Sequence, residues 1–187
     1  MILAAHQINL FPFEGIAEKA RASDVFVLLG QVQFSPGNYH NRFHQGGRWF
    51  TLSVHRGLEP LVEKRYADPF ADFERIKRRM GPRYASLLSE FDDCISEQLA
   101  ETNGAIIWRL FRKLGIGVEI AWDWPTDLRG TDRLVDLCKR FGADRYLSGP
   151  SGPKYLDLDV FEREGIRVIV QEPVGRRAAV ELLEKIR

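Results

Sequence analysis

Short runs of apolar residues alternate with stretches of helical periodicity along much of the chain. Residues 2–5 and 25–29 are apolar runs of strand length, and continuous runs of this kind are typical of strands buried in a parallel sheet. Between them, residues 14–22 carry apolar positions at helical spacing. These three segments therefore predict a strand, a helix and a second strand that form a β–α–β unit.

The same alternation returns after the middle of the chain. Thr131 is a good N-cap residue for a helix over 132–141, and Gly142 is suited to follow the end of that helix. The other elements predicted there are strands at 117–122, 144–147 and 166–170 and helices at 155–163 and 177–186.

The middle of the chain interrupts this alternation. Residues 48–54 alternate in polarity, which predicts a strand with one covered face, whereas most of residues 69–114 have helical periodicity. We interpret residues 69–114 as a helical insertion, either a cap over the sheet or a set of crossover helices. The whole pattern predicts one α/β domain over residues 1–187, with a mainly parallel sheet in a three-layer, Rossmann-like arrangement.

Composition and charge narrow the classes of function. The 187 residues are 44% hydrophobic and 28% charged, which suits a globular protein with a buried core. The net charge of +1 argues against binding to duplex nucleic acid, which needs a basic excess. Cys94 and Cys138 are predicted to be buried thiols. No leader or membrane-spanning segment is visible, so we expect a cytoplasmic protein without membrane insertion.

Ligands of open parallel sheets bind beyond the carboxyl ends of the strands, and this rule selects two polar segments. A third candidate segment follows the second strand. The first follows the strand at residues 2–5 and contains His6 and Asn9. Together with backbone amides at the start of the next helix, these side chains are suited to hold an oxygen anion. The alternative is that His6 and Asn9 only cap the turn.

The second segment, which we call the late loop, runs from Ser148 to Lys154 and follows the strand at 144–147. Gly149 and Gly152 permit a ligand to approach the backbone closely. Ser148 and Ser151 offer hydroxyl groups, and Lys154 is placed to contact a phosphate. These five residues predict a cofactor-binding loop, and the alternative is an ordinary turn.

The third segment, residues 33–44, is dense in side chains that form directed hydrogen bonds. It predicts a substrate-binding surface to which Arg42 contributes positive charge, and the alternative is a solvated loop. His40 and His44 lie one helical turn apart in sequence, but no carboxylate or cysteine is nearby, so no metal site is predicted. The predicted substrate-binding residues are Gln33, Asn38, His40, Asn41 and, after the late loop, Tyr155.

Several short motifs together resemble the WbqC-like protein family. They occur in the same order as in the family and extend from about residue 5 to residue 172. They include His6-Gln7-x-Asn9, Ser23-Asp24-Val25-Phe26-Val27, Asn41-Arg42, Gly142-Ala143-Asp144 and Tyr146-Leu147-Ser148-Gly149-Pro150-x-Gly152. The resemblance implies a role in the biosynthesis of surface polysaccharides or specialised metabolites.

The chain departs from the family pattern before Val32 and Gln33. Gly30 and Gln31 stand where an acidic pair often occurs in the family. If that pair acts as an acid, a base or an anchor for an amine, its loss implies altered chemistry or a different substrate.

The layout is also similar to that of nucleotidylyltransferases and adenylate-forming ligases. His6 and Asn9 fall on the two polar positions of the motif that follows the first strand in those enzymes, and the late loop falls where they bind phosphate. Ile8 replaces the glycine between the polar positions and is expected to crowd a nucleobase. This resemblance implies ATP or another nucleotide as a cofactor.

These observations predict an enzyme that transfers an acyl, aminoacyl or nucleotidyl group to a small amine- or sugar-type acceptor. His6, Asn9 and Arg42 are the predicted catalytic residues, with His6 donating a hydrogen bond to the oxygen that develops negative charge. The alternative is a protein that binds a small molecule, or assembles with a biosynthetic enzyme, without catalysis. The sequence predicts no particular oligomeric state.

Overall fold

The computed structural model describes residues 1–175, 177 and 179–184. Its centre is a five-stranded sheet in which every pairing is parallel and the strand order is β5-β2-β1-β6-β7. The strands are β1 (Ile2–Gln7), β2 (Val25–Leu29), β5 (Glu119–Trp122), β6 (Arg145–Ser148) and β7 (Arg167–Val170). All five predicted sheet strands form, and β1 extends beyond its predicted end to include His6 and Gln7.

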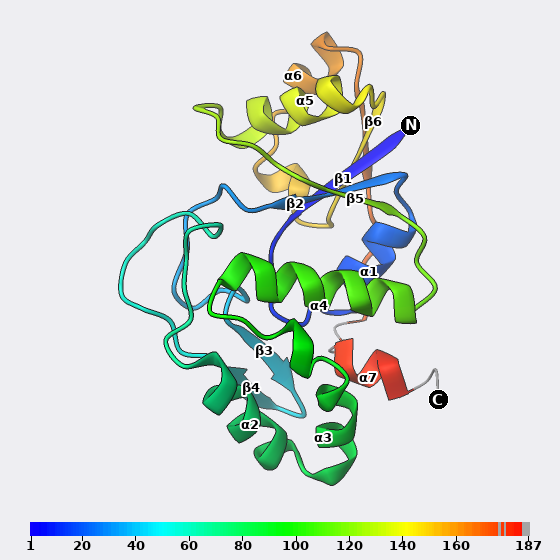
Figure 1. Cartoon of the computed structure of the whole chain (residues 1–187). Helices are drawn as coiled ribbons and strands as arrows, with labels where there is room; N and C mark the ends of the chain where they lie inside the picture. The colour runs from blue at the N-terminus through cyan, green and yellow to red at the C-terminus, as the bar shows by residue number, and fades with distance from the viewer. Residues whose placement is uncertain (176, 178, 185–187) are drawn as a thin grey trace.

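Helices cover both faces of this sheet, as Figure 1 shows. On one face lie α1 (Glu14–Arg21) and α4 (Leu99–Lys113), and on the other lie α5 (Gly130–Phe141) and α6 (Leu158–Arg163). Because successive strand residues point to opposite faces, β1 supplies Ala4 to the core on the α1 and α4 side and Leu3 to the core on the α5 and α6 side. The three-layer, Rossmann-like α/β fold is confirmed.

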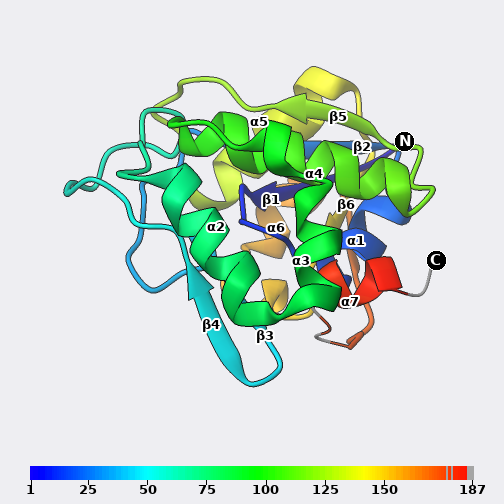
Figure 2. The same cartoon turned by 60° about the horizontal axis from the view of Figure 1, so that its bottom comes forward.

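A second group of elements lies between β2 and β5. It contains an antiparallel hairpin, β3 (Arg42–Gln45) and β4 (Arg48–Thr51), which lies beside the helices α2 (Pro69–Met80) and α3 (Pro82–Ser89) (Figures 1 and 2). The short 3-10 helix η1 (Asp92–Cys94) connects α3 to α4. Helices therefore occupy most of residues 69–114, as the periodicity predicts.

The hairpin corrects two boundaries. Residues 42–44 were expected in a loop, but they form a strand because Phe43 pairs with Phe50 and both rings are buried. Gly46 and Gly47 make the tight turn between the strands with φ values of 54° and 76°, a conformation that glycine adopts without strain. The strand expected over 48–54 ends at Thr51.

Helix ends also differ from the expectations. Thr131 is not an N-cap residue: α5 begins at Gly130, two residues before the expected start, and Thr131 Oγ1 instead accepts a hydrogen bond of 3.0 Å from Asp157 N. Gly142 does follow α5 in the left-handed conformation, at φ 67°. The helix expected over 155–163 begins later, as α6, and the 3-10 helix η2 (Gly152–Lys154) precedes it.

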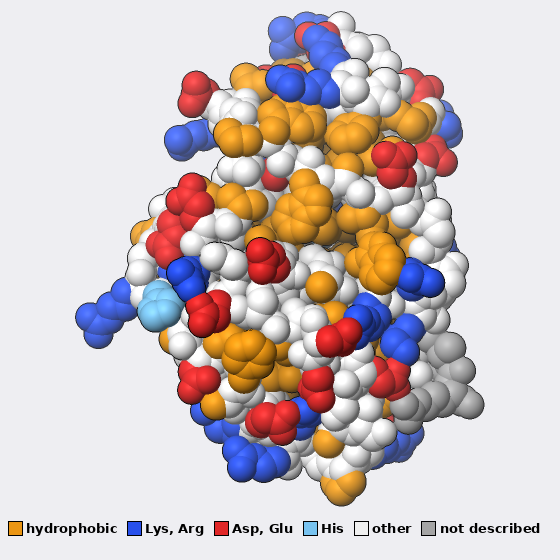
Figure 3. Space-filling model, viewed as in Figure 1, with side chains coloured by type: hydrophobic (Ala, Val, Ile, Leu, Met, Phe, Trp, Pro, Cys, Tyr) orange, Lys and Arg blue, Asp and Glu red, His pale blue; other side chains and the backbone are white. Residues whose placement is uncertain are grey.

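Part of the last predicted helix lies within the described residues. Of the expected 177–186, α7 covers Ala179–Glu184, and residues 178, 185 and 186 lie outside the described residues. None of the helices in the described ranges is both long enough and apolar enough to cross a bilayer. Figure 3 shows apolar side chains gathered on the surface over α4 and β5, where Trp108 and Trp122 are exposed.

Candidate functional site

The strand order reverses between β1 and β6. From β1 the chain builds the sheet outward to β2 and β5, and it then returns to the other side of β1 to form β6 and β7. The helix after β1 and the helix after β6 lie on opposite faces (Figure 1), and in sheets of this kind ligands bind beyond the strand ends at the point of reversal. We call this place the switch-point crevice.

The ladder between β1 and β6 ends early at the crevice. Its last pair is Ala4 with Leu147, whereas the ladder between β1 and β2 continues to Gln7 with Leu29. The carbonyl of Met1 accepts from Arg145 on β6, and backbone groups alternate along a strand, so the carbonyl of Ala5 also faces the β6 side. The early end leaves that carbonyl without a partner from β6.

Lys19 of α1 fills this opening. Its Nζ donates a hydrogen bond of 2.9 Å to Ala5 O and lies 5.8 Å from the centre of the Tyr146 ring. The side chain is only 5% exposed and has no carboxylate partner among the described residues. Burial lowers the pKa of Lys19 to about 8, so the amine is mainly a cation at neutral pH and gives up its proton more readily than an exposed lysine.

His6, which is part of β1, lies beside Lys19. Its Nδ1 is 2.9 Å from Gln7 O, and because a carbonyl oxygen can only accept, Nδ1 carries the proton and Nε2 keeps its lone pair. Burial, and then the charge of Lys19, lower the pKa of His6 to about 4. His6 is therefore neutral near pH 7 and offers Nε2 as a hydrogen-bond acceptor or base, which differs from the donor role expected from the sequence.

His40 supports this part of β1 from the third segment. Its Nε2 lies 2.8 Å from Gln7 Oε1, and its Nδ1 accepts a 3.4 Å contact from Ser35 N. Burial lowers the pKa of His40 to about 4, which keeps the ring neutral. Because both ring nitrogens have protein partners, His40 orients Gln7 and offers no nitrogen to a metal.

Asn103 of α4 joins the same two segments. Its Nδ2 donates to Ile8 O at 3.1 Å and to His40 O at 2.7 Å, and its Oδ1 accepts from the Tyr66 hydroxyl at 2.8 Å. The whole group is buried, so each of these bonds satisfies a polar atom that water does not reach. The helices between β2 and β5 thus fix the chain that leaves β1.

The turn after β1 carries the next candidate residue. Asn9 is 5% exposed, yet its side chain makes no hydrogen bond to any residue in the described ranges, so its amide is free to meet a ligand. Phe11, two residues later, has a φ of 47°, a conformation that costs energy in a residue with a Cβ. Its ring contacts those of Phe43, Phe73 and Phe91, and this packing holds the turn in place.

The start of α1 is less open than the sequence suggests. The carboxylate of Glu14 pairs with Arg177, whose Nε lies 2.9 Å from Glu14 Oε2, and Glu14 N donates to Arg177 O. A Cβ on Gly15 would lie 3.2 Å from a methyl group of Val174. The C-terminal segment therefore covers the helix-start amides that were expected to hold an anion.

The late loop divides into a packed part and an open part. Ser148 is buried, and its hydroxyl donates to Gly149 O at 3.1 Å. Gly152 packs directly on Ser148, because a Cβ at Gly152 would overlap the Ser148 hydroxyl, whereas a Cβ at Gly149 would meet only open space. Ser151 and Lys154 of the loop are exposed, as is Tyr155 directly after it.

Replacing Gly152 by alanine is expected to destabilise the protein by about 2 kcal/mol, because buried Ser148 must move to admit the methyl group. Gly149→Ala is the matched control and should change the free energy of unfolding by less than about 0.5 kcal/mol. Denaturant unfolding of both variants measures the difference. Equal stability of the two would contradict this account of the loop.

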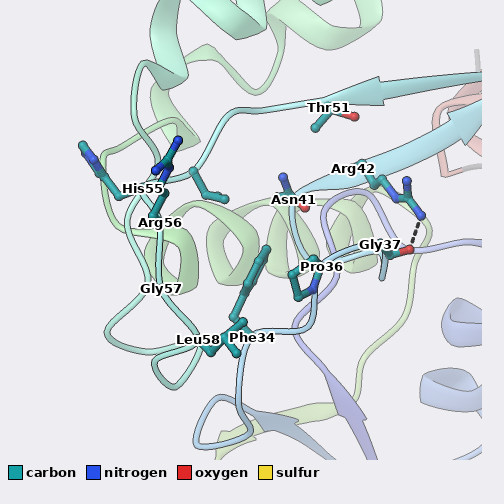
Figure 4. Close-up of a pocket in the computed structure, with 11 residues that line it drawn as sticks. Phe34, Pro36, Gly37, Asn41, Arg42, Thr51, His55, Arg56, Gly57 and Leu58 are labelled. Atoms are coloured by element: carbon teal, nitrogen blue, oxygen red, sulfur yellow. Dashed lines mark hydrogen bonds between the residues drawn. The ribbon is translucent and has the colours of Figure 1, made fainter.

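The third segment lines a different hollow. The pocket has a volume of about 420 Å³ and lies between the β3–β4 hairpin and residues 54–58 (Figure 4); we call it the hairpin pocket. Asn41 and Arg42 line it, whereas Gln33 and Asn38 are exposed and do not. The structure thus divides the candidate residues between the crevice, which takes the ends of β1 and β6, and the hairpin pocket.

Asp123 occupies the region where the family often has its acidic pair. Its Oδ1 accepts from Gly30 N at 2.8 Å and from Gln31 N at 3.1 Å, and its Oδ2 pairs with Arg133. A Cβ at Gly30 would lie 2.5 Å from a methyl carbon of Val62, so residue 30 has no room for an acidic side chain without a shift. Burial raises the pKa of Asp123 above its usual value.

Three residues of the site, Lys19, Asn103 and Asp123, were not predicted from the sequence. Lys19 lies three positions after Ile16, on the buried side of α1, and a lysine at such a position is the signal that it has a buried role. Asn103 has a similar signal, since it interrupts the apolar face of α4. Asp123 follows β5 directly, and the rule that sites lie at strand ends points to it as well.

The sequence profile of the WbqC-like protein family matches residues 7–176, a span that contains the crevice residues from Gln7 onward and the whole hairpin pocket. The chain belongs to the WbqC-like protein family. This WbqC-like protein is 27% identical over 187 aligned positions to uncharacterized protein Rv1507c of Mycobacterium tuberculosis, covering 89% of this chain and 80% of that protein. No solved structure matches it significantly. The family resemblance expected from the motifs is confirmed.

Proposed function

We propose that this WbqC-like protein is a group-transfer enzyme in the biosynthesis of surface polysaccharides or specialised metabolites, and that its reaction centre is the switch-point crevice. It moves an acyl, aminoacyl or nucleotidyl group to a small amine- or sugar-type acceptor. One observation carries the proposal: the unprotonated His6 Nε2 and the buried Lys19 ammonium occur together where the β1–β6 ladder ends. A base beside a cation is what the transfer of such a group needs.

The proposed reaction assigns one task to each group. The acceptor's amine or hydroxyl gives its proton to His6 Nε2 as its lone pair attacks the carbonyl carbon or phosphorus of the donor. The Lys19 ammonium and the Asn9 amide stabilise the negative charge that develops on the oxygen of that centre. The leaving group then departs with its bonding electron pair, and the transferred group remains on the acceptor.

The proposal changes the role of Arg42. Its Nη2 donates to Gly37 O, its Nε donates to Asn38 O at 3.2 Å, and its guanidinium stacks on Trp49 at 4.1 Å from the ring centre. These contacts hold the guanidinium at the hairpin pocket. Arg42 is therefore assigned to binding, and Lys19 takes the place of the cation at the reaction centre.

A nucleotide donor is consistent with two features. Ile8 was expected to crowd a nucleobase, but its side chain is fully buried in the core, where a ligand at the end of β1 does not meet it. Ser151 and Lys154 are exposed near the end of β6, where they are accessible to a phosphate group. ATP or another nucleotide therefore stays among the donors to be tested.

The test is a search for co-substrate consumption. The protein is incubated with ATP, CTP, nucleotide sugars and acyl-carrier thioesters, each with a mixture of small amines and amino sugars, and loss of the donor is followed by mass spectrometry. Turnover by the unmodified protein, with a loss of about 100-fold or more in His6→Gln, supports the proposal. His44→Gln is the matched control because His44 is exposed on the hairpin.

The alternative function gives a different result. Glycine and glutamine in place of the acidic pair favour a protein that binds a ligand or an enzyme without catalysis. Such a protein would bind a donor, shown by a rise in melting temperature, and would leave it unconsumed. Binding without turnover across the whole mixture would overturn the proposed transfer activity.

A further inference from the structure

The hairpin pocket has the composition of a ligand site. Its volume of about 420 Å³ falls within the range of small-molecule sites, about 300–1,000 Å³. Apolar side chains form much of its wall, and the arginines Arg42 and Arg56 lie on opposite sides of it (Figure 4). The apolar residues are Phe34, Pro36, Val54 and Leu58.

A buried lysine holds one wall of this pocket in shape. Lys64 is fully buried, and its Nζ donates to His55 O at 2.6 Å, to Gly57 O at 2.9 Å and to Glu59 Oε1 at 3.0 Å. The same ammonium lies 4.7 Å from the centre of the Phe34 ring. Burying an ammonium is costly, and here it holds together residues 55–59, four of which are exposed. The wall is thus formed before any ligand binds.

The opposite wall is also fixed. Asn41 is 8% exposed, and its Nδ2 donates to Leu52 O at 2.8 Å, so the side chain is held at the edge of the pocket. The guanidinium of Arg42 is held by its bonds to the carbonyls of Gly37 and Asn38 and by Trp49. Preorganised walls of this kind lower the entropic cost of binding.

The charges around the pocket have one sign. Arg56 makes no hydrogen bond or ion pair with any residue that the structure describes. Arg42 donates hydrogen bonds to backbone carbonyls, which are neutral. Among the described residues no carboxylate lines the pocket, and the charge of nearby Glu59 is neutralised by Lys64 at 3.0 Å. An apolar cavity with two uncompensated guanidiniums at its rim is complementary to a negatively charged group on an apolar body.

We propose that the hairpin pocket binds an organic anion that consists of a compact apolar body and a carboxylate or phosphate group. The apolar body lies against Phe34, Pro36 and Leu58, the anion meets Arg56, and Arg42 adds positive charge at the opposite rim. The pocket is built by residues outside the switch-point crevice, and the proposal does not depend on the transfer activity. If the protein transfers a group as proposed, the hairpin pocket binds the part of a substrate that does not react.

Calorimetric titration with four simple probes tests the proposal. Benzoate and phenyl phosphate carry both required features, benzyl alcohol lacks the charge, and inorganic phosphate lacks the apolar body. We expect benzoate or phenyl phosphate to bind at least about tenfold more tightly than either partial probe, a difference of about 1.4 kcal/mol. Whichever of benzoate and phenyl phosphate binds more tightly identifies the preferred anion as a carboxylate or a phosphate. If neither benzoate nor phenyl phosphate binds more tightly than both benzyl alcohol and inorganic phosphate, the proposal is overturned.

Two variants place the binding in this pocket. Arg56→Gln removes an exposed charge without touching the core and should weaken binding of the tighter probe about tenfold while leaving benzyl alcohol unaffected. Leu58→Asp puts a negative charge into the wall and should abolish binding of that probe. Arg48→Gln is the matched control, because Arg48 is exposed on the same hairpin but does not line the pocket. Unchanged affinity in Arg56→Gln and Leu58→Asp would refute the assignment.

Discussion

Lowering the pH from 7 to 4 is expected to remove about 3 kcal/mol of stability through His40 and a smaller amount through His6. The ordinary histidine pKa is 6.5, and burial lowers the pKa of both residues to about 4 in the folded protein. Below pH 6.5 the unfolded chain therefore binds protons that the folded protein does not accept. His6 contributes less because its side chain is partly exposed.

Two carboxyl groups with lowered pKa values lose their contributions to stability in a different range of pH. The Arg109 side chain and the N-terminal ammonium hold the pKa values of Asp93 and Asp144 below the ordinary value of 3.8. A carboxyl group with a lowered pKa keeps its stabilising effect above that value and loses it at lower pH. The loss of stability between pH 6.5 and 4 is consequently not caused by these two carboxyl groups.

Denaturant unfolding at several pH values between 7 and 4.5 measures this effect. His40→Gln should flatten the dependence of the free energy of unfolding on pH, and His44→Gln should leave it as in the unmodified protein, since His44 is exposed. The baseline stability of His40→Gln will be lower, so the comparison concerns the slope. If His40→Gln has the slope of the unmodified protein, His40 is not the neutral, buried group described above.

Replacing buried Lys19 or buried Lys64 by methionine is expected to have opposite effects at pH 7. Lys64→Met should destabilise the protein by about 3 kcal/mol, because two carbonyls and the Glu59 carboxylate lose their donor. Lys19→Met should leave stability unchanged or raise it by up to about 2 kcal/mol. Burial of the Lys19 ammonium opposes folding, and its one hydrogen bond to Ala5 O offsets only part of that cost.

The pH dependence provides a second measurement of the same difference. The pKa of Lys19 falls from 10.5 to about 8 on folding, so the penalty is complete below pH 8 and disappears as pH rises toward 10.5. The advantage of Lys19→Met should therefore shrink over that interval. Under the proposed function the same variant loses group-transfer activity, which would show a residue kept for chemistry at the expense of stability. Destabilisation of Lys19→Met as large as that of Lys64→Met would contradict this.

The sequence predicts the sheet well because its signals are local. The run at residues 25–29 consists of five apolar residues that can only be buried on both faces, and the structure places a strand at the same residues. The glycine after α5 likewise acts within one turn of the chain. The hairpin at 42–51 was only half predicted, because the polar residues around Phe43 conceal its pairing with Phe50.

The site is harder to predict because its contacts join distant residues. Nothing in the segment around Lys19 indicates that the β1–β6 ladder ends where its amine arrives. The bond from His40 to Gln7 and those of Asn103 also depend on how the elements between β2 and β5 pack. The rule for strand ends predicts that His6 and Ser148 lie at the same edge of the sheet, but only the strand order makes β1 and β6 neighbours.

The strand order also determines how the chain folds. On the side away from β1, β2 pairs with β5, and the hairpin, α2, α3 and α4 all intervene in sequence. Pairing across such a long stretch is slow, because the loop must close before the contacts can form. Until then the apolar, β-branched edge of residues 25–29 is open to other chains, which is a known route to aggregation. A chain that stops short of residue 119 is therefore expected to expose that edge permanently and to accumulate as insoluble material.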